Sequence, residues 1–310
     1  MSLLDDASLI LTPNGYKDGT AYTLKPTPIG VGNFDVVRNT SATRVNENGL
    51  IESVGANVPR IDYTNGEASW LVEPQDTNIT NYSEQLDNAY WVKTRTLITA
   101  NDTIAPDGES TADKLVANTD DNLHFIIKGG FEVSDEYKVF SLFLKASEYN
   151  SAYVVLRGGS SFANRVEIRL NISDGTLYSS GVFGTFSGLD TKIEDYGDGW
   201  YQVQLKAFVP ASEISILTQL VIGNDNVFTF AGDGTSGIYA WGLGLTDDFG
   251  SYIPTEATAV TRNADEITTA PPTGTTEITE YFEGGTTNVI TSIPATYQLP
   301  NGRIKKIITT

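Results

Sequence analysis

The chain has 310 residues, of which 40% are hydrophobic and 10% aromatic, enough for the core of one large domain with extensions. Its formal net charge of -19 at pH 7 repels the phosphates of nucleic acids and anionic lipid surfaces, so we expect neither nucleic acid nor a membrane among its partners. The absence of cysteine excludes disulfides and thiolate metal sites.

The N-terminal part, residues 1–70, is polar and rich in turns, with only short strand patterns such as "GLIES" (49–53). The opening stretch has no basic segment before an apolar run, so we expect no signal peptide and a chain made in a cytoplasm. Because so polar a segment buries little apolar surface, it is not expected to fold alone. We predict an extended segment that wraps the main domain or packs against copies of itself.

Residues 71–266 carry runs of alternating apolar and polar residues, which are typical of half-buried strands. We predict strands over 137–146, 151–158, 164–172, 175–181, 199–209 and 236–245. "SDG" (173–175) predicts a tight hairpin turn, because Asp174 and Gly175 suit the positive φ of such turns. The predicted fold class is all-β, an antiparallel β-sandwich in which a jelly roll is favoured over an immunoglobulin-like arrangement.

One strand raises a specific question about a tryptophan. In "YGDGWYQVQLKAF" (196–208), Trp200 and Tyr201 begin a strand and must point to opposite faces. If Tyr201, Val203 and Leu205 face the core, Trp200 lies on the other face. There it is either a platform for a sugar or a plug under a loop.

The C-terminal part, residues 267–310, begins with a threonine-rich run that contains Pro271 and Pro272 and reads as a linker. Beyond it, "EITEYFEGGTTNVI" and "ATYQLPNGRIKKIITT" predict strands around turns. We expect a short C-terminal β tail, which forms an edge hairpin or pairs with a neighbouring subunit.

No residue pattern predicts catalysis, so we expect that the protein is not an enzyme and has no catalytic residues. The one histidine, His124, alternates with Phe125 and is expected on the polar face of a strand. No phosphate loop or zinc motif occurs. With 39 acidic residues, some carboxylates are expected to lie near one another by chance. We interpret the acidic residues as a solvated surface rather than as the catalytic pair of a glycosidase.

Hard oxygen donors cluster at Asp120, Asp121 and Asn122, and Asp225 lies in a second such stretch. Calcium prefers such donors, but the spacing is not that of an EF-hand. Calcium is therefore a possible cofactor, and no other is expected.

Aromatic residues at strands and strand edges are candidates for glycan contact, since a sandwich can present rings on which sugars stack. The alternative is that these rings pack in the core or clamp loops. The candidates are Tyr90, Trp91, Trp200, Tyr239 and Trp241.

Three stretches, taken together and in order, resemble a family of bacteriophage virion proteins described as head spike, head fibre or tail fibre proteins. They are "SWLVEPQDTNITNYSEQLDNAYW" followed by "IAPDGESTADKL", then "GDGWYQVQL", and finally "GDGTSGIYAWGLGLTDDFGSYIPTEATAVTRNADE". The resemblance covers residues 35 to 266. It departs from the family at "WGLGLTDDFGS", where "WGAQLEEGS" is usual.

The resemblance implies a jelly-roll domain like those of concanavalin A and carbohydrate-binding modules, but no catalytic residues. It implies a structural protein at the capsid surface of the virion, made in the bacterial host's cytoplasm. The expected partners are two further copies in a homotrimer, other capsid or virion proteins, and cell-surface glycans. Residues 1–70 would then serve attachment or trimerisation. In the family the Trp-Tyr pair recurs, which favours Trp200 as a ring that covers the sheet's outer edge or a loop.

Two other functions share these motifs. A receptor-binding tail fibre would have the same stretches, and a polysaccharide depolymerase would add catalysis on host capsule. Gene neighbours and the release of sugar from capsule would separate these alternatives.

Overall fold

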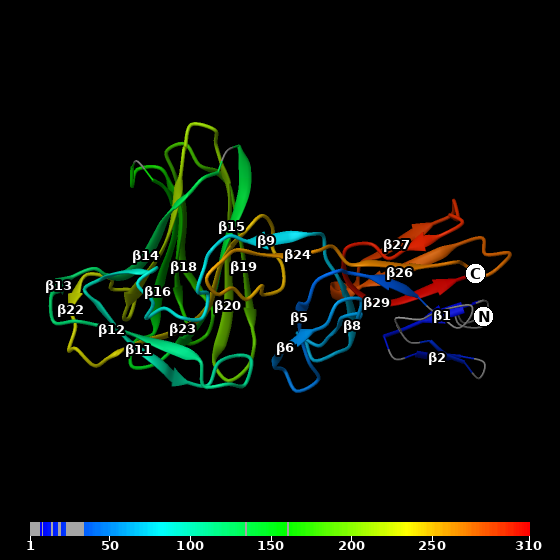
Figure 1. Cartoon of the computed structure of the whole chain (residues 1–310), viewed down its shortest axis with the longest axis horizontal. Coiled ribbons are helices and arrows are strands. Elements are labelled where there is room, and N and C mark those ends of the chain that lie inside the picture. The colour runs from blue at the N-terminus through cyan, green and yellow to red at the C-terminus, as the bar shows by residue number, and fades with distance from the viewer. Residues whose placement is uncertain are drawn as a thin grey trace. The chain divides into compact units, whose positions relative to one another are not determined.

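A computed structural model of the chain describes residues 7, 9–13, 15–17, 20–22, 34–133, 135–159 and 161–310. The chain divides into two compact units (Figure 1). The sandwich unit is Thr77–Val260, and the terminal unit combines Met1–Asp76 with Thr261–Thr310. The sandwich unit is thus inserted, in sequence, between the two halves of the terminal unit.

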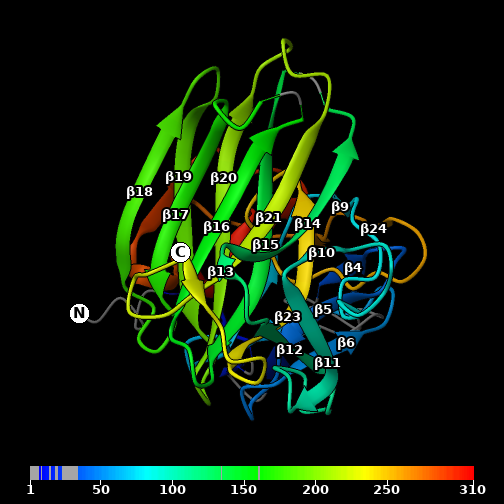
Figure 2. The same cartoon turned by 90° about the vertical axis from the view of Figure 1, so that its left-hand side faces the viewer.

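The sandwich unit consists of two six-stranded antiparallel sheets, and the chain crosses between them repeatedly. The first sheet, which faces the viewer in Figure 2, has the order β10 (Val92–Thr94), β14 (His124–Phe131), β21 (Ile216–Gly223), β16 (Ser151–Gly158), β17 (Arg165–Asn171), β18 (Leu177–Phe183). The second sheet has the order β11 (Thr96–Thr103), β12 (Ala112–Ala117), β23 (Gly237–Thr246), β15 (Glu136–Ala146), β20 (Trp200–Val209), β19 (Ser187–Asp195). Short strands β13 (Asp121–Asn122) and β22 (Phe230–Ala231) pair beside them. The predicted all-β sandwich is confirmed.

The core of the sandwich unit follows from the alternation seen in the sequence. Along β20 the side chains of Val203, Leu205 and Ala207 are fully buried between the sheets, and Tyr201 packs against the same cluster. Between β17 and β18 the predicted hairpin turn is present, with φ of 73° at Gly175. The strand predictions therefore succeed where one face of a strand is apolar and where the turn contains a residue suited to positive φ.

The terminal unit is built from both ends of the chain, although the sequence suggested a separate leader and tail. Its largest sheet has the order β27 (Thr287–Ile290), β26 (Ile278–Phe282), β29 (Gly302–Thr309), β8 (Ser69–Val72), β7 (Ile61–Asp62), and β1 (Leu9–Leu11) also pairs with β29. A second sheet has the order β28 (Tyr297–Gln298), β25 (Glu266–Thr269), β4 (Asp35–Val37). Its other elements are β2 (Gly15–Lys17), β3 (Thr20–Tyr22), β5 (Ala42–Val45), β6 (Ile51–Val54) and the 3-10 turn η1 (Glu283–Gly285). The paired strands β9 (Asp76–Asn78) and β24 (Val260–Arg262) contain the residues at which the chain passes from one unit to the other.

The terminal unit has an apolar core of its own, which neither end of the chain could build alone. Trp70 from the N-terminal half packs in one cluster with Ile267, Ile304 and Ile307 from the C-terminal half. Strand β29 lies inside the sheet between β26 and β8 rather than at its edge. Both backbone edges of β29 are therefore paired, which an edge strand would leave partly open.

A buried ionic clasp also joins the two halves of the terminal unit. Arg38 and Arg60 both bind the carboxylate of Asp265, which is buried. Glu73 pairs with Arg60 at 2.7 Å and with Arg262 at 2.8 Å. Removing one member of such a network leaves an uncompensated buried charge, which is strongly destabilising. The clasp therefore holds together the chain segments that enter and leave the sandwich unit.

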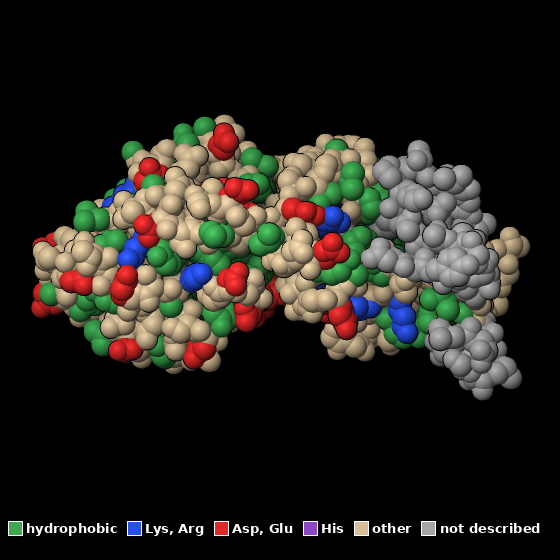
Figure 3. All heavy atoms as spheres, turned by 90° about the horizontal axis from the view of Figure 1, so that it is seen from below, with side chains coloured by type: hydrophobic (Ala, Val, Ile, Leu, Met, Phe, Trp, Pro, Cys, Tyr) green, Lys and Arg blue, Asp and Glu red, His purple; other side chains and the backbone are tan. Residues whose placement is uncertain are grey.

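The acidic side chains do not gather into one patch on the face shown in Figure 3, where they are spread among polar and apolar groups. No helix in the described part of the chain is long and apolar enough to cross a membrane.

Candidate functional site

Trp200 is a packing residue. Its side chain is 2% exposed at the start of β20, and its Nε1 donates a hydrogen bond to the backbone oxygen of Ile104 at 3.1 Å. Ile104 lies in the loop between β11 and β12. The prediction that Trp200 covers a neighbouring loop is confirmed, and its ring is closed to ligands in this structure.

Trp91 and Trp241 are also buried. The Nε1 of Trp91 donates to the backbone oxygen of Tyr82 at 3.0 Å. The ring of Trp241 packs against Phe143 and Tyr252, at centroid distances of 5.3 and 4.6 Å. Trp91 belongs to the core cluster between the sheets, and Trp241 packs in an aromatic group outside it, so neither offers a free ring face.

The two remaining predicted aromatics, Tyr90 and Tyr239, are half-buried. Tyr90 precedes β10 of the first sheet, and the Nζ of Lys128 lies 4.1 Å from its ring centroid. Tyr239 lies on β23 of the second sheet, with the Nζ of Lys114 at 5.9 Å from its ring centroid. Glycan contact stays a prediction for these two tyrosines, but the five predicted residues do not form one site.

His124 does not lie on a polar face, and that expectation is wrong. Its side chain is fully buried, with Nδ1 at 2.7 Å from the backbone oxygen of Arg95 and Nε2 at 2.9 Å from that of Phe230. On β14 it shares the inward face with Ile126, and Phe125 lies on the outward face, the reverse of the expected arrangement. Both ring nitrogens are engaged by backbone, which suits a structural role.

Two of the four expected calcium donors are held by amide side chains. Asp120 accepts a hydrogen bond from Asn118 at 2.9 Å, and Asp225 accepts one from Asn150 at 2.8 Å. Within the described residues no three side chains of histidine, cysteine, aspartate or glutamate are grouped so that they could hold a metal ion. A calcium site stays a prediction to which this geometry adds no support.

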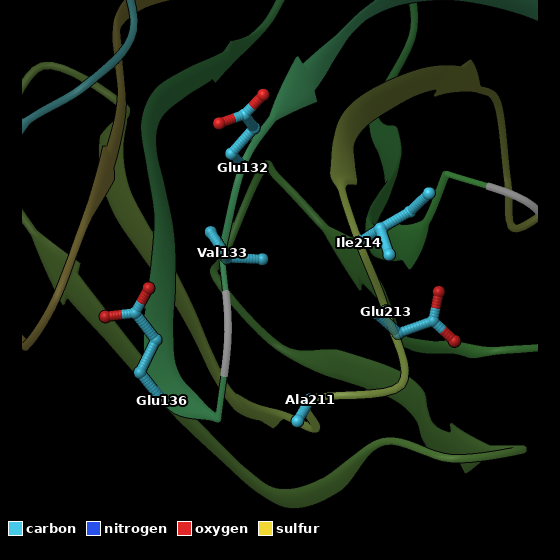
Figure 4. A pocket seen from close by; sticks show the side chains of 6 residues that line it. All are labelled: Glu132, Val133, Glu136, Ala211, Glu213 and Ile214. Atoms are coloured by element: carbon cyan, nitrogen blue, oxygen red, sulfur yellow. The ribbon is translucent and has the colours of Figure 1, made fainter.

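An acidic cavity of about 480 Å³ opens between the β14–β15 and β20–β21 connections (Figure 4). Its lining residues are Glu132, Val133, Glu136, Ala211, Glu213 and Ile214. Glu213 is buried and accepts hydrogen bonds from Asn164 at 2.6 Å and Thr185 at 3.0 Å. Figure 4 shows that its carboxylate does not converge with those of Glu132 and Glu136. The cavity therefore does not present the facing pair of carboxylates that glycoside hydrolysis requires.

The outward side of β16, β17 and β18 in the first sheet carries a cluster that sequence reasoning missed. Register places Arg157 opposite Arg165, and Arg165 opposite Phe183. We call the set the arginine face; it comprises Tyr153, Arg157, Phe162, Arg165, Glu167, Arg169 and Phe183. In Figure 2 these strands lie on the side turned to the viewer.

Arg165 is fixed at the centre of the arginine face. Its guanidinium lies 4.3 Å from the ring centroid of Phe162 and 3.9 Å from that of Phe183. Its Nε donates to Glu167 at 2.5 Å. Phe162 and Phe183 are 46% and 39% exposed, so each keeps accessible surface while it contacts the arginine.

The next row of the arginine face is equally constrained. The hydroxyl of Tyr153 donates to Glu167 at 2.5 Å, and Arg169 lies 4.8 Å over the Tyr153 ring. Burial, together with the neighbouring Glu167 carboxylate, raises the pKa of Tyr153 to about 12. Stacked rings and charge-assisted hydrogen bonds leave these side chains little freedom, so the arginine face is preorganised for contact.

The alternation in "RVEIRLN" could have placed Arg165, Glu167 and Arg169 on one outward face, since β17 has that pattern. It could not show which strands flank them. Phe162 comes from the β16–β17 loop and Phe183 from the end of β18, and only the register brings both rings to Arg165.

The residues that carry the family resemblance are largely structural. Glu73 and Asp265 belong to the ionic clasp. Asn78 donates to the backbone oxygen of Ile253 at 2.8 Å, and Asp113 accepts from the backbone nitrogens of Leu86 and Asn101. These four residues thus tie segments of the fold together.

Comparison with known proteins assigns no family. No family model matches the chain, and no curated protein matches it. Among solved structures, one similar chain is a carbohydrate-binding module described for its specific recognition of mannan. It is 10% identical, the match covers 58% of this chain and 98% of that one, and the TM-score is 0.30. So slight a likeness carries no argument, and the fold assignment rests on the sheets themselves.

Proposed function

We propose that this protein is a non-enzymatic adhesion protein that binds glycans through the arginine face. The observation that supports it is a preorganised outward sheet surface on which two half-exposed phenyl rings flank arginine side chains. Rings of this kind offer apolar area to the faces of sugars, and guanidinium groups donate hydrogen bonds to hydroxyl and acidic groups. The predicted tryptophans, in contrast, are committed to packing.

At a finer level, we propose a structural virion protein of a bacteriophage, a head fibre or spike attached to the capsid as a homotrimer. The support is the resemblance of the three stretches and the cysteine-free, acidic composition. A tail fibre that binds a receptor is the alternative on the same motifs. A cryo-EM map of the particles tests this level, and a chain found at the tail tip or missing from particles would rule out the head location.

Glycan binding is tested by retention of the full chain on a panel of immobilised neutral and acidic polysaccharides. The variant Phe162→Ala should bind at least about fivefold more weakly, since loss of a central aromatic contact costs more than about 1 kcal/mol. Val289→Thr in the terminal unit, where Val289 is 53% exposed, is the matched control and should bind as wild type. Retention on no polysaccharide at all would contradict the proposed function.

A further inference from the structure

We propose that the ligand of the arginine face is an anionic glycan, whose carboxylate or sulfate group is received by Arg157. This inference rests on the proposed glycan binding and narrows its ligand class. Two observations support it. The arginine face is positively charged although the chain is acidic, and Arg157 has no anionic partner among the described residues.

The arginine face is positive although the chain is acidic. Along the outward rows of β14, β16, β17, β18 and β21, the charged side chains are Arg157, Arg165, Arg169 and Glu167. Three arginines and one glutamate give a local charge of 3 - 1 = +2, in a chain whose net charge is -19. An anion approaching this surface therefore meets local attraction, although the chain as a whole is acidic.

Glu167 cannot neutralise all three arginines. Its carboxylate already accepts hydrogen bonds from Arg165 and from the hydroxyl of Tyr153. Arg169 lies at the limit of ion-pair distance, 4.0 Å from Glu167, with 41% of its side chain exposed. The remaining cationic capacity of the arginine face is thus concentrated at Arg157 and the free edge of Arg169.

Arg157 makes no ion pair and no side-chain hydrogen bond with any described residue, and its Nε is buried without a partner. Among the described residues, its guanidinium has a cation-π contact with the ring of Phe162, whose centroid lies 5.6 Å from the guanidinium carbon. It also stands directly opposite Arg165, and like charges in that position repel. Burial lowers the pKa of Arg157, in keeping with a cation that has lost water without gaining an anion.

An anionic sugar satisfies these requirements together. Its charged group would give Arg157 the planar two-point partner that guanidinium favours, and would relieve the repulsion between the paired arginines. Its ring would lie against the exposed surface of Phe162 or Phe183. A neutral sugar would use the rings but leave Arg157 unpaired.

The test is a glycan array that presents matched neutral, uronate-bearing and sulfated oligosaccharides to the full chain at low and high salt. Wild type should prefer the acidic members, and the preference should fall with added salt because exposed charges are screened. Arg157→Gln should weaken acidic binding about tenfold, the loss of one charge-assisted contact, and weaken neutral binding much less, since a hydrogen bond to an uncharged hydroxyl contributes less. Lys192→Gln on β19, which removes the same charge from the second sheet, is the control.

The outcomes are distinct for the two proposals. Acidic preference lost in Arg157→Gln but kept in Lys192→Gln supports the inference, and the uronate and sulfate members identify the anion. Binding to neutral glycans with no effect of Arg157→Gln overturns the inference while the proposed glycan binding stands. Binding to no glycan, by a wild-type chain shown to be folded by its thermal transition, overturns both.

Discussion

At the scale of single residues, tryptophans in the sandwich unit work through both their rings and their indole nitrogens. The Nε1 of Trp200 reaches a loop backbone oxygen, and that of Trp241 reaches the hydroxyl of Thr111 at 3.1 Å. A ring that fills space and a donor that fixes a loop are two separable contributions. Such residues stabilise the fold, whereas the exposed rings of Phe162 and Phe183 are free to contact a ligand.

Two substitutions at Trp200 should separate the ring from the donor. Trp200→Ala removes a buried ring and should lower the free energy of unfolding by about 3–5 kcal/mol. Trp200→Phe keeps most of the ring but leaves the oxygen of Ile104 without its donor, and should cost about 1–2 kcal/mol. Denaturant unfolding of both variants measures this, and an Ala variant as stable as wild type would show that Trp200 does not cover the loop.

At the scale of elements, the connection between β15 and β16 is fastened to two other strands by Glu148. Its carboxylate pairs with Lys114 on β12 at 2.8 Å and accepts a hydrogen bond from the backbone nitrogen of Gly237, at the start of β23, at 3.1 Å. Burial alone would raise the pKa of Glu148, but hydrogen bonds from Lys114, Ser147 and backbone groups lower it to about 2. One partly exposed side chain thus ties a loop to the second sheet.

The lowered pKa of Glu148 predicts a contribution to acid stability. Because the folded-state pKa of about 2 lies below the ordinary value of 4.5, the contribution is present above pH 4.5 and is lost as the pH falls towards 2. Glu148→Gln should lower stability at pH 7 by no more than about 1 kcal/mol, since Glu148 is half exposed and solvent screens the pair. The difference from wild type should shrink between pH 5 and pH 2 in unfolding experiments.

Glu47→Gln, at an exposed position of the terminal unit, is the control for this measurement. A deficit of Glu148→Gln that stayed constant from pH 5 to pH 2 would mean that the charge of Glu148 contributes nothing.

At the scale of the whole molecule, the chain combines one continuous and one discontinuous folding unit. The sandwich unit has its own core and all strands of its two sheets within Thr77–Val260. The terminal unit depends on β29, whose partners β26, β8 and β1 come from both halves of the unit. The two units should therefore differ in their response to changes at the C-terminal end.

A chain that ends at Pro300 should lose the terminal unit and keep the sandwich unit. Removal of β29 takes Ile304 and Ile307 out of the terminal core, removes the buried Ile308, and leaves three strands without their partner. Calorimetry should show the loss of one unfolding transition, and limited proteolysis should leave a fragment close to Thr77–Val260. Loss of all cooperative unfolding would show that the sandwich unit cannot stand without the terminal unit.

The sequence predicts single strands well and their partners poorly. Alternation marks β20, whose residues Val203, Leu205 and Ala207 lie in the core, while β16 is marked by a short run of β-branched and apolar residues that is buried on both faces. Gly175 marks the turn after β17. Pairing between strands more than two hundred residues apart, as between β8 and β29, leaves no trace in local pattern. That is why the terminal unit appeared as a leader and a tail.

The candidate site was harder to predict for the same physical reason. The predicted tryptophans lie at strands and strand edges, and nothing in their neighbours along the chain shows that a loop such as the one at Ile104 covers them. The arginine face needs three strands in register before Arg165 meets two rings. The composition gives the number of arginines, but it does not show that three of them lie on one surface.

The central position of β29 has a consequence for how the protein is made. During synthesis, β1 and β8 leave the ribosome before the sandwich unit, but their partner β29 emerges only after it. The sandwich unit can fold in the meantime. Its folding brings the two halves of the terminal unit closer together, which lowers the loop-closure entropy of pairing β29 with the earlier strands. The sandwich unit would then promote folding of the terminal unit, and the core of the terminal unit would form last in a nascent chain.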